Sequence, residues 1–406
     1  MKQYIFLAHT IGGLTGSATY VRNKMKWLEK KGWEVIVFDG TGANNTPIVI
    51  EEFKQFENNR IKELYFSPSL FWKININRIL DKIISKIPHS DFVVIESNNP
   101  NLAMWGELLA NRLCAKHIIY TLGEKDKIRS YREFDFLNYK ASNEELFCID
   151  SKAVTLLFDD YKTSINPETH YWNACNSAPV EYYKFHSIDS LIKDGIFIGY
   201  FGREKTYLNN VIDNIIKFAL NHIEIKVSFV LLGVNKLSDE FVTKLSPISN
   251  LKYYCIEAQP IIPKQFFNLC DIVIANAACA LIAYEEGCKV ISMNVKNNEP
   301  LGILGFTTNE ISFESTQYKD GRQLYVLLED VLIDNSSKYN ESHIELPHIT
   351  KGYEYQESFA YKSANKPYEV SNINPPNNIK EIIKSIFINI GFINVISKHR
   401  YKTKRS

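Results

Sequence analysis

The sequence has no long apolar run and almost no net charge. No stretch approaches the roughly 18 consecutive apolar residues that a membrane-spanning helix needs. Its 47 lysines and arginines oppose 46 aspartates and glutamates, so no overall charge attracts a polyanion. A nucleic acid partner is therefore not expected. The opening MKQYIFLAHT has too short an apolar run for a secretory signal, and we interpret it as a first buried strand.

Cysteines are few and scattered singly. They form neither a C-x-x-C pair nor a cluster with histidines at metal-ligand spacing. This distribution favours a reduced, cytoplasmic interior over a disulfide scaffold, and it gives no support for a bound metal. The cysteines are Cys114, Cys148, Cys175, Cys255, Cys270, Cys279 and Cys288.

Short apolar runs alternate with helix-periodic segments along most of the chain. In the first predicted helix, apolar residues recur at three- and four-residue steps from Ala18 to Leu28, and Gly32 ends the pattern. A further helix is expected after residue 150, with Ser151 as its N-cap. This alternation is typical of βαβ units around a mostly parallel sheet. After the opening strand, further strands are predicted at 34–39, 91–97, 117–122, 145–150, 196–202, 226–233, 251–258, 271–277 and 289–294.

The 406 residues, 45% of them apolar, are enough for two cores. We predict an α/β protein of two tandem Rossmann-like, doubly wound domains, residues 1–178 and 195–345. Such sheets bind ligands beyond the carboxyl ends of their strands, so a cleft between the domains is the expected site.

Residues 346–406 depart from this rhythm. An irregular connection precedes an apolar helical face at Ile382, Ile383, Ile386, Phe387 and Ile390, and a basic end follows it. An apolar helix with a basic flank can lie on an anionic membrane surface. Alternatively, the helix packs on the first domain and the tail is solvated. The two interpretations can both hold.

The loop IGGLTG, residues 11–16, follows the first strand and allows three interpretations. A dinucleotide-binding loop would need a glycine where Ile11 stands, although Asp39 lies at a suitable distance to bind a ribose. Alternatively, Gly12, Gly13 and Gly16 leave room for a phosphate or sugar oxygen at a helix N-terminus. The third interpretation is a tight turn without a ligand.

Two segments of the second half are suited to a diphosphate. Arg203 and Lys205 follow the strand that ends at Gly202, where their side chains can face an anionic ligand. A turn of small residues then leads into a short helix, whose N-terminal amides can meet phosphate oxygens. The turn comprises Ala277, Ala278, Cys279 and Ala280, and the helix ends at Glu285 and Glu286, which could accept ribose hydroxyls or be simply solvated.

In order and spacing, these parts over residues 1–345 resemble the GT-B glycosyltransferases, especially the bacterial surface-polysaccharide enzymes of the family 4 type. The resemblance rests on the glycine loop, IGYFGREK, FVLLG ending at Gly233, and CDIVIANA with EEGCKVIS. It implies a UDP- or GDP-sugar donor held mainly by the second domain, with Arg203 and Lys205 on the diphosphate. It further implies a saccharide acceptor, lipid-linked or free, near the glycine loop.

The chain departs from that family at two positions. The family's second donor-site glutamate corresponds to Ile282, and Gly123 followed by Glu124 stands where many relatives have a histidine. Glu124 is either a replacement acid/base group or a solvated loop residue. The absence of an Asp-x-Asp motif argues against a metal-dependent GT-A transferase.

We therefore predict a metal-independent glycosyltransferase of bacterial surface-polysaccharide synthesis with no cofactor. It would be cytoplasmic and peripheral on the inner face of the membrane. A nucleotide-sugar 2-epimerase of the same fold and a non-catalytic saccharide-binding relative are the alternatives.

Overall fold

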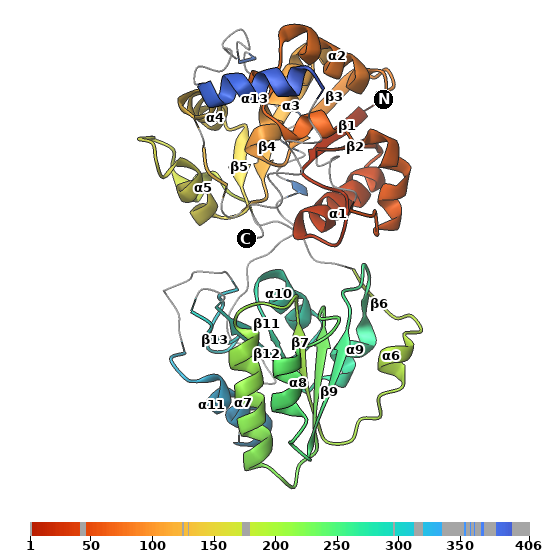
Figure 1. Ribbon diagram of the computed structural model, residues 1–406, viewed down its shortest axis with the longest axis vertical. Coiled ribbons are helices and arrows are strands. Elements are labelled where there is room, and N and C mark those ends of the chain that lie inside the picture. Colours follow the sequence, from red (N-terminus) through yellow and green to blue (C-terminus); the bar gives the residue numbers. More distant parts are fainter. Residues whose placement is uncertain are drawn as a thin grey trace. The chain divides into compact units, whose positions relative to one another are not determined.

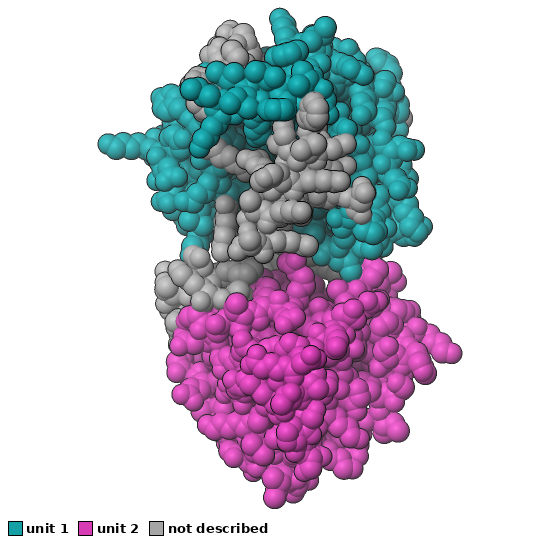
Figure 2. Space-filling view, in the orientation of Figure 1, with its two compact units in different colours: residues 1–176, 348–406 teal, residues 177–347 magenta. Residues whose placement is uncertain are grey.

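The computed structural model divides the chain into two compact units (Figure 2). Unit 1 comprises Met1–Asn176 and His348–Ser406, and unit 2 comprises Ser177–Pro347. The structure describes residues 2–40, 46–123, 126–128, 130–172, 179–294, 297–311 and 320–334, then 353–354, 358, 361, 367–368 and 379–391.

Unit 1 is built on a five-stranded parallel sheet with strand order β2-β1-β3-β4-β5. Most of its strand residues are buried, as expected when helices cover both faces of a parallel sheet. From β1 the chain adds β2 on one side and then β3, β4 and β5 on the other, so the strand order reverses between β1 and β3. The strands are β1 (Lys2–Ala8), β2 (Trp33–Asp39), β3 (Phe92–Ser97), β4 (Lys116–Thr121) and β5 (Leu146–Cys148).

The helices of unit 1 begin at identifiable caps. The Thr15 side chain accepts the Ala18 N–H at the start of α1, and Asn99 accepts the Leu102 N–H at the start of α3. Asp150, rather than the predicted Ser151, caps α5, because its carboxylate accepts the Ala153 N–H at 2.6 Å. The helices are α1 (Gly16–Lys30), α2 (Lys73–Ile84), α3 (Pro100–Leu113), α4 (Tyr131–Ser142) and α5 (Ser151–Phe158), with 3-10 helices at Glu51–Asn59, Lys62–Tyr65, Pro68–Leu70 and Pro167–Thr169.

Unit 2 contains a six-stranded sheet with strand order β13-β12-β11-β7-β8-β9, in which only the β12–β13 pair is antiparallel. Its strands are β7 (Ile196–Phe201), β8 (Val227–Leu232), β9 (Leu251–Ile256), β11 (Ile272–Ala275), β12 (Val290–Met293) and β13 (Pro300–Ile303). A separate two-stranded sheet joins β6 (Val180–Glu181) to β10 (Ile262–Pro263).

Helices pack on both faces of the larger sheet of unit 2. Leu208, Val211, Ile212 and Ile215 of α7 lie in the core on one face, and Phe266 and Phe267 of α9 lie in the core on the other. The predicted α/β class with two Rossmann-like units is thereby confirmed. The helices are α6 (His186–Asp189), α7 (Leu208–Asn221), α8 (Asp239–Leu245), α9 (Lys264–Leu269), α10 (Ala277–Glu285) and α11 (Leu324–Glu329), and a π-helical turn follows at Asp330–Asp334.

One helix from the end of the chain, α13 (Ile379–Asn389), belongs to unit 1. Figure 1 shows it in blue among the red and orange elements of the first part of the chain. Ile388 is buried in a core cluster with Leu70, Phe71 and Ile79. The helix therefore packs on unit 1, while the basic residues after 391 lie outside the described part of the chain. None of the helices in the described residues is both long and apolar enough to cross a bilayer.

Unit 1 buries a line of polar side chains between α3, β4 and α4. The His117 Nδ1 lies 2.8 Å from a Glu107 carboxylate oxygen, and its Nε2 lies 2.9 Å from the Ser97 Oγ. Lys140 also donates to Glu107, at 3.0 Å. The line has the order of a hydrolase triad, but Ser97 is 0% exposed and His117 is 4% exposed. A substrate therefore cannot reach the hydroxyl, and we interpret the line as structural.

The same line predicts acid sensitivity. Burial, reinforced by the Lys140 charge, lowers the pKa of His117 to about 4. The unfolded state binds this proton at its ordinary pKa of about 6.5. Unfolding thus takes up a proton between these values, so stability falls as the pH drops from about 6.5 to about 4. At pH 5 the expected loss is about 2 kcal/mol relative to pH 7.5.

Urea unfolding at pH 7.5 and pH 5 measures this loss. The His117→Gln variant has no titrating side chain at this position. Between pH 7.5 and pH 5, its free energy of unfolding should therefore fall by about 2 kcal/mol less than that of the unaltered chain. An exposed histidine serves as the control, because His89→Gln should keep the full pH dependence. An equal pH dependence in all three proteins would show that His117 does not titrate differently on unfolding.

Candidate functional site

The strand order of unit 2 reverses between β7 and β11. From β7 the sheet continues through β8 and β9 on one side, and from β11 through β12 and β13 on the other. In doubly wound sheets, ligands bind beyond the carboxyl ends of the strands at such a reversal. Here the two segments after those strand ends are 202–207 and 276–280, which carry most of the predicted donor-binding residues.

Side chains connect the two segments. The Lys205 Nζ donates to the Asn276 Oδ1 at 2.8 Å, and the Tyr207 hydroxyl donates to the same oxygen at 3.2 Å. Tyr207 is fully buried, and Asn276 is 2% exposed. The ammonium group that follows β7 is therefore held at the residue that precedes α10.

Asn276 is the N-cap of α10 but does not use its side chain to cap the helix. Its Nδ2 is buried and has no hydrogen-bond partner among the described residues. The next residue, Ala277, has φ +50° and donates its N–H to the Ile311 carbonyl at 2.8 Å. This conformation is uncommon outside glycine and is often found at functional sites. An unsatisfied amide donor and the positive end of a helix dipole thus lie beside Lys205.

The charges of both cations act on Cys279, in the first turn of α10. Burial raises the pKa of the Cys279 thiol to about 11, while the charges of Lys205 and Arg203 oppose that rise. Arg203 itself is exposed, and its carbonyl accepts the Tyr200 hydroxyl at 2.7 Å. The structure therefore brings Arg203, Lys205 and the predicted turn of small residues into one neighbourhood.

Two glycines determine how the backbone leaves the sheet at this point. Gly202 has φ +149° and Gly233 has φ +104°. A Cβ on Gly233 would lie 2.5 Å from the Gly202 carbonyl oxygen, so the segments after β7 and β8 approach too closely for a side chain. Backbone packing thus explains the glycine at 233, and the positive φ explains the glycine at 202.

Glu285 and Glu286 lie at the opposite end of α10. Eight residue steps along a helix span about 12 Å, so the structure does not bring them to the helix N-terminus. Glu286 forms an ion pair with Lys264 at 3.0 Å, and Glu285 is exposed. The predicted ribose contact of these two carboxylates stays a prediction.

In unit 1, the glycine loop follows β1 at the reversal between β1 and β3. A Cβ on Gly12 would lie 2.7 Å from the Thr46 carbonyl oxygen. Gly13 has φ +71° and donates its N–H to the Pro47 carbonyl, and Gly16 is the first residue of α1. Chain packing therefore accounts for Gly12 and Gly13, whether or not a sugar binds beside them.

Asp39 does not fit a ribose-binding role. Its side chain is 0% exposed, and one of its carboxylate oxygens accepts the Arg60 Nε–H at 3.0 Å. A dinucleotide ribose has no access to that carboxylate, which argues against the nicotinamide interpretation of the loop. Glu124, the predicted acid/base residue, lies outside the described residues.

Asn98 and Asn276 were not predicted as site residues from the sequence. Each follows a strand at the reversal of its own sheet, Asn98 after β3 and Asn276 after β11. The Asn98 Oδ1 is buried without a hydrogen-bond partner among the described residues, as is the Asn276 Nδ2. The motifs ESN and IAN, an asparagine directly after a buried run, are the sequence feature that could have indicated them. The described residues contain no group of three or more His, Cys, Asp or Glu side chains suited to a metal ion.

Comparison with known proteins supports the fold. No family model and no curated protein matched the sequence. Among solved structures, a glycosyltransferase from Rickettsia africae is similar with a TM-score of 0.53 and 10% identity, over 99% of this chain and 98% of that one. HepE from Anabaena in complex with UDP has a TM-score of 0.46 and 12% identity, over 95% and 99% of the two chains. MnaA from S. aureus with UDP has a TM-score of 0.45 and 13% identity, over 83% and 89%. The Rickettsia structure shows that this chain shares the GT-B fold.

Proposed function

We propose that the protein is a glycosyltransferase that moves a sugar from a nucleotide-sugar donor to a saccharide acceptor. The observation that carries the proposal is the 2.8 Å contact between the Lys205 Nζ and the Asn276 Oδ1 across the strand-order reversal of unit 2. It holds a cation beside a helix N-terminus, which is an arrangement that binds phosphate groups. A UDP- or GDP-sugar would bind there through its diphosphate.

The same groups would act in the reaction. When the bond between sugar and diphosphate breaks, negative charge increases on the leaving phosphate. Lys205, Arg203 and the free N–H groups of α10 can stabilise that charge, and interactions that strengthen in the transition state accelerate the chemical step. Arg203 can bind two phosphate oxygens at once, whereas Lys205 acts as a point charge. This chemistry needs no resident cofactor.

Unit 1 would bind the acceptor. The loop with Gly12, Gly13 and Gly16 and the unsatisfied amide oxygen of Asn98 both lie at the reversal of its sheet. We propose a saccharide, free or lipid-linked, of bacterial surface-polysaccharide synthesis at the inner face of the cell membrane, with Glu124 as the acid/base candidate.

A thermal-shift panel with UDP, GDP, CMP and NAD tests the donor site. A ligand at 100 times its Kd stabilises the native state by about 2.7 kcal/mol, so UDP or GDP should raise the melting temperature by several degrees. The Arg203→Ala/Lys205→Ala variant should fold and lose that shift. A Lys236→Ala/Lys252→Ala variant of exposed lysines in the same unit is the matched control and should keep it.

Two outcomes would contradict the proposal. A shift with NAD alone would point to a dinucleotide enzyme, and a nucleotide shift that survives the double substitution would place the donor elsewhere. Product analysis with donor but no acceptor separates a transferase from an epimerase, because an epimerase converts the sugar itself.

A further inference from the structure

Helix α13 presents its apolar side outward. Five large apolar residues of α13, and Ile390 directly after it, recur at spacings of three and four and are 43% to 76% exposed. A helix that packs on a globular core normally buries such a stripe. The exposed residues are Ile379, Ile382, Ile383, Ile386, Phe387 and Ile390.

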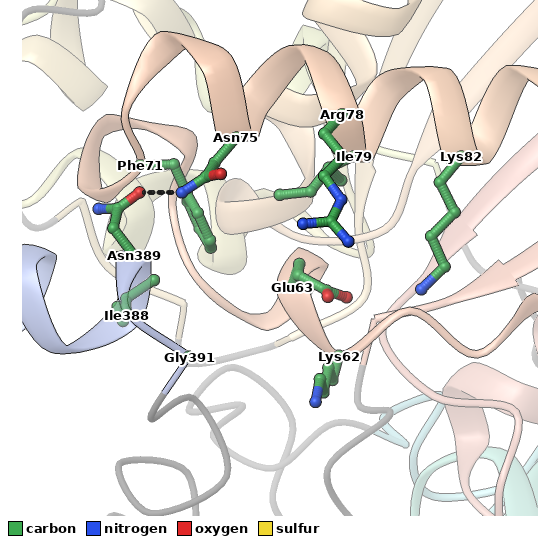
Figure 3. A pocket seen from close by; sticks show the side chains of 10 residues that line it. All are labelled: Lys62, Glu63, Phe71, Asn75, Arg78, Ile79, Lys82, Ile388, Asn389 and Gly391. Atoms are coloured by element: carbon green, nitrogen blue, oxygen red, sulfur yellow. Dashed lines mark hydrogen bonds between the residues drawn. The ribbon is translucent and has the colours of Figure 1, made fainter.

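Specific hydrogen bonds fix this orientation. On the inner side of α13, the Ser385 Oγ and the Asn389 Nδ2 donate to the Leu70 carbonyl at 2.8 and 2.9 Å. The Asn389 Oδ1 accepts the Trp72 N–H at 2.8 Å and the Asn75 amide at 2.7 Å, the latter drawn in Figure 3. Rotating the isoleucines inward would break these four bonds, so their exposure is built into the packing.

A cationic pocket of about 480 Å³ adjoins the C-terminal end of α13. Lys62, Arg78 and Lys82 line it together with one carboxylate, Glu63, and Asn389 and Gly391 close its α13 side. Figure 3 shows Arg78 and Lys82 extending from α2 toward Glu63. Neither Arg78 nor Lys82 forms a hydrogen bond or ion pair through its side chain with any described residue. The pocket therefore carries an excess of positive charge that can accept an anionic group.

Apolar side chains continue on the α2 side of this pocket. Trp72, which precedes α2, is 51% exposed, and Ile74 in its first turn is 73% exposed. Ile74, Arg78 and Lys82 follow one another at four-residue steps, so they lie on one stripe of the helix. Exposed apolar residues thus accompany the cations on α2 as well as on α13.

We infer that the outer face of α13 and this pocket form a docking surface for an anionic phospholipid bilayer. The isoleucines would enter the acyl boundary, and the pocket would receive a lipid phosphate. Charge complementarity favours this occupant over a second copy of the chain, which would bring the same cations. The sequence that continues from Gly391 adds five lysines and arginines and no acidic residue in residues 392–406. This inference does not depend on the proposed sugar transfer.

Vesicle flotation with the full chain tests the inference. Vesicles of phosphatidylcholine with about 30% phosphatidylglycerol have the negative surface potential that attracts basic segments, so they should bind the protein, and pure phosphatidylcholine should bind at least ~10-fold less. Ile383→Asn/Ile386→Asn/Ile390→Asn and Arg78→Gln/Lys82→Gln should each reduce binding ~5-fold or more. These side chains are exposed, so folding should persist.

Matched controls isolate the surface. Ile192→Asn/Ile223→Asn replaces isoleucines that are 85% and 74% exposed in unit 2, and Lys236→Gln/Lys252→Gln replaces exposed lysines there; both should bind vesicles fully. Removal of residues 392–406 separates the basic end from the surface, and vesicle binding should decrease but remain sensitive to both variants. Inorganic phosphate at millimolar concentration should not release the protein.

Three results would overturn the inference. In the first, the isoleucine variant or the Arg78/Lys82 variant binds vesicles as well as its control. In the second, removal of residues 392–406 abolishes the difference between these variants and their controls. In the third, the unaltered protein is a dimer and the isoleucine variant is a monomer that binds vesicles equally well. The last result would assign the face to a second copy of the chain. The thermal shift with UDP or GDP reports on unit 2 and vesicle binding reports on unit 1, so either proposal can fail without the other.

Discussion

Replacing Lys24 by methionine is expected to lower the free energy of unfolding by about 3–5 kcal/mol. The Lys24 ammonium and the Glu96 carboxylate form an ion pair in the core of unit 1, where the two side chains are 1% and 0% exposed. Burial lowers the pKa of Lys24, and the Glu96 charge opposes that change. Without the ammonium, a carboxylate would remain buried without a counter-charge, which is the costly part of breaking such a pair.

Neutral groups around Glu96 would not replace the ammonium. The hydroxyls of Tyr4 and Tyr20 donate to its two oxygens at 2.6 and 3.0 Å, and the Asn98 amide donates at 2.8 Å. These bonds satisfy lone pairs but bring no positive charge. A Lys24→Met/Glu96→Gln double variant removes both charges and should recover most of the loss.

Urea unfolding of the single and double variants measures the coupling. Arg112→Met, which removes an exposed ion pair with Asp81, is the control and should change stability by less than about 1 kcal/mol. If Lys24→Met costs no more than Arg112→Met, the buried pair does not need its counter-charge. A Lys24→Met protein with an unchanged free energy of unfolding would contradict the prediction most directly.

The sheets could be predicted from the sequence, whereas this ion pair could not. A run such as VVIES has few conformations open to it other than a buried strand, so β3 was predicted within one residue. Lys24 lies in the segment VRNKMKWLEK, where four lysines and arginines share a helix and only three-dimensional packing decides which are buried. Its partner Glu96 is 72 residues away, beyond the reach of any local pattern.

The candidate site was predictable where charged residues come directly after a strand. Arg203 and Lys205 come immediately after β7, so a strand assignment is enough to place them. Asn276 was missed because a single asparagine after a strand is common in turns. Glu285 and Glu286 were assigned to the site because they end the helix that follows the turn of small residues, and the length of α10 separates them from its N-terminus.

The orientation of α13 could not be predicted from the sequence, for a different reason. Its apolar face was predicted correctly, yet the sequence could not say that Ser385 and Asn389, on the opposite side, attach it to unit 1. Two hydrogen-bonded polar residues decide the orientation there against the usual preference of isoleucine for the core.

Replacing Lys205 by glutamine should reduce kcat by 10²–10³-fold, the range seen when one preorganised electrostatic contact is lost. Glutamine can still donate to the Asn276 Oδ1, so the segment after β7 should keep its place while the charge is lost. Since negative charge on the diphosphate is greatest as the sugar leaves, the ammonium contributes more in the transition state than in the bound donor, and KM should rise less than kcat falls.

The measurement is the rate at which the nucleotide is released from its nucleotide-sugar donor, and the donor is chosen to carry the nucleotide that gives the thermal shift. Lys236→Gln, an exposed lysine of the same unit, should turn over at the unaltered rate, and Lys205→Arg should recover part of the loss. A variant that raises KM alone would show that Lys205 holds the donor equally in the ground and transition states, and its part in catalysis would then reduce to binding.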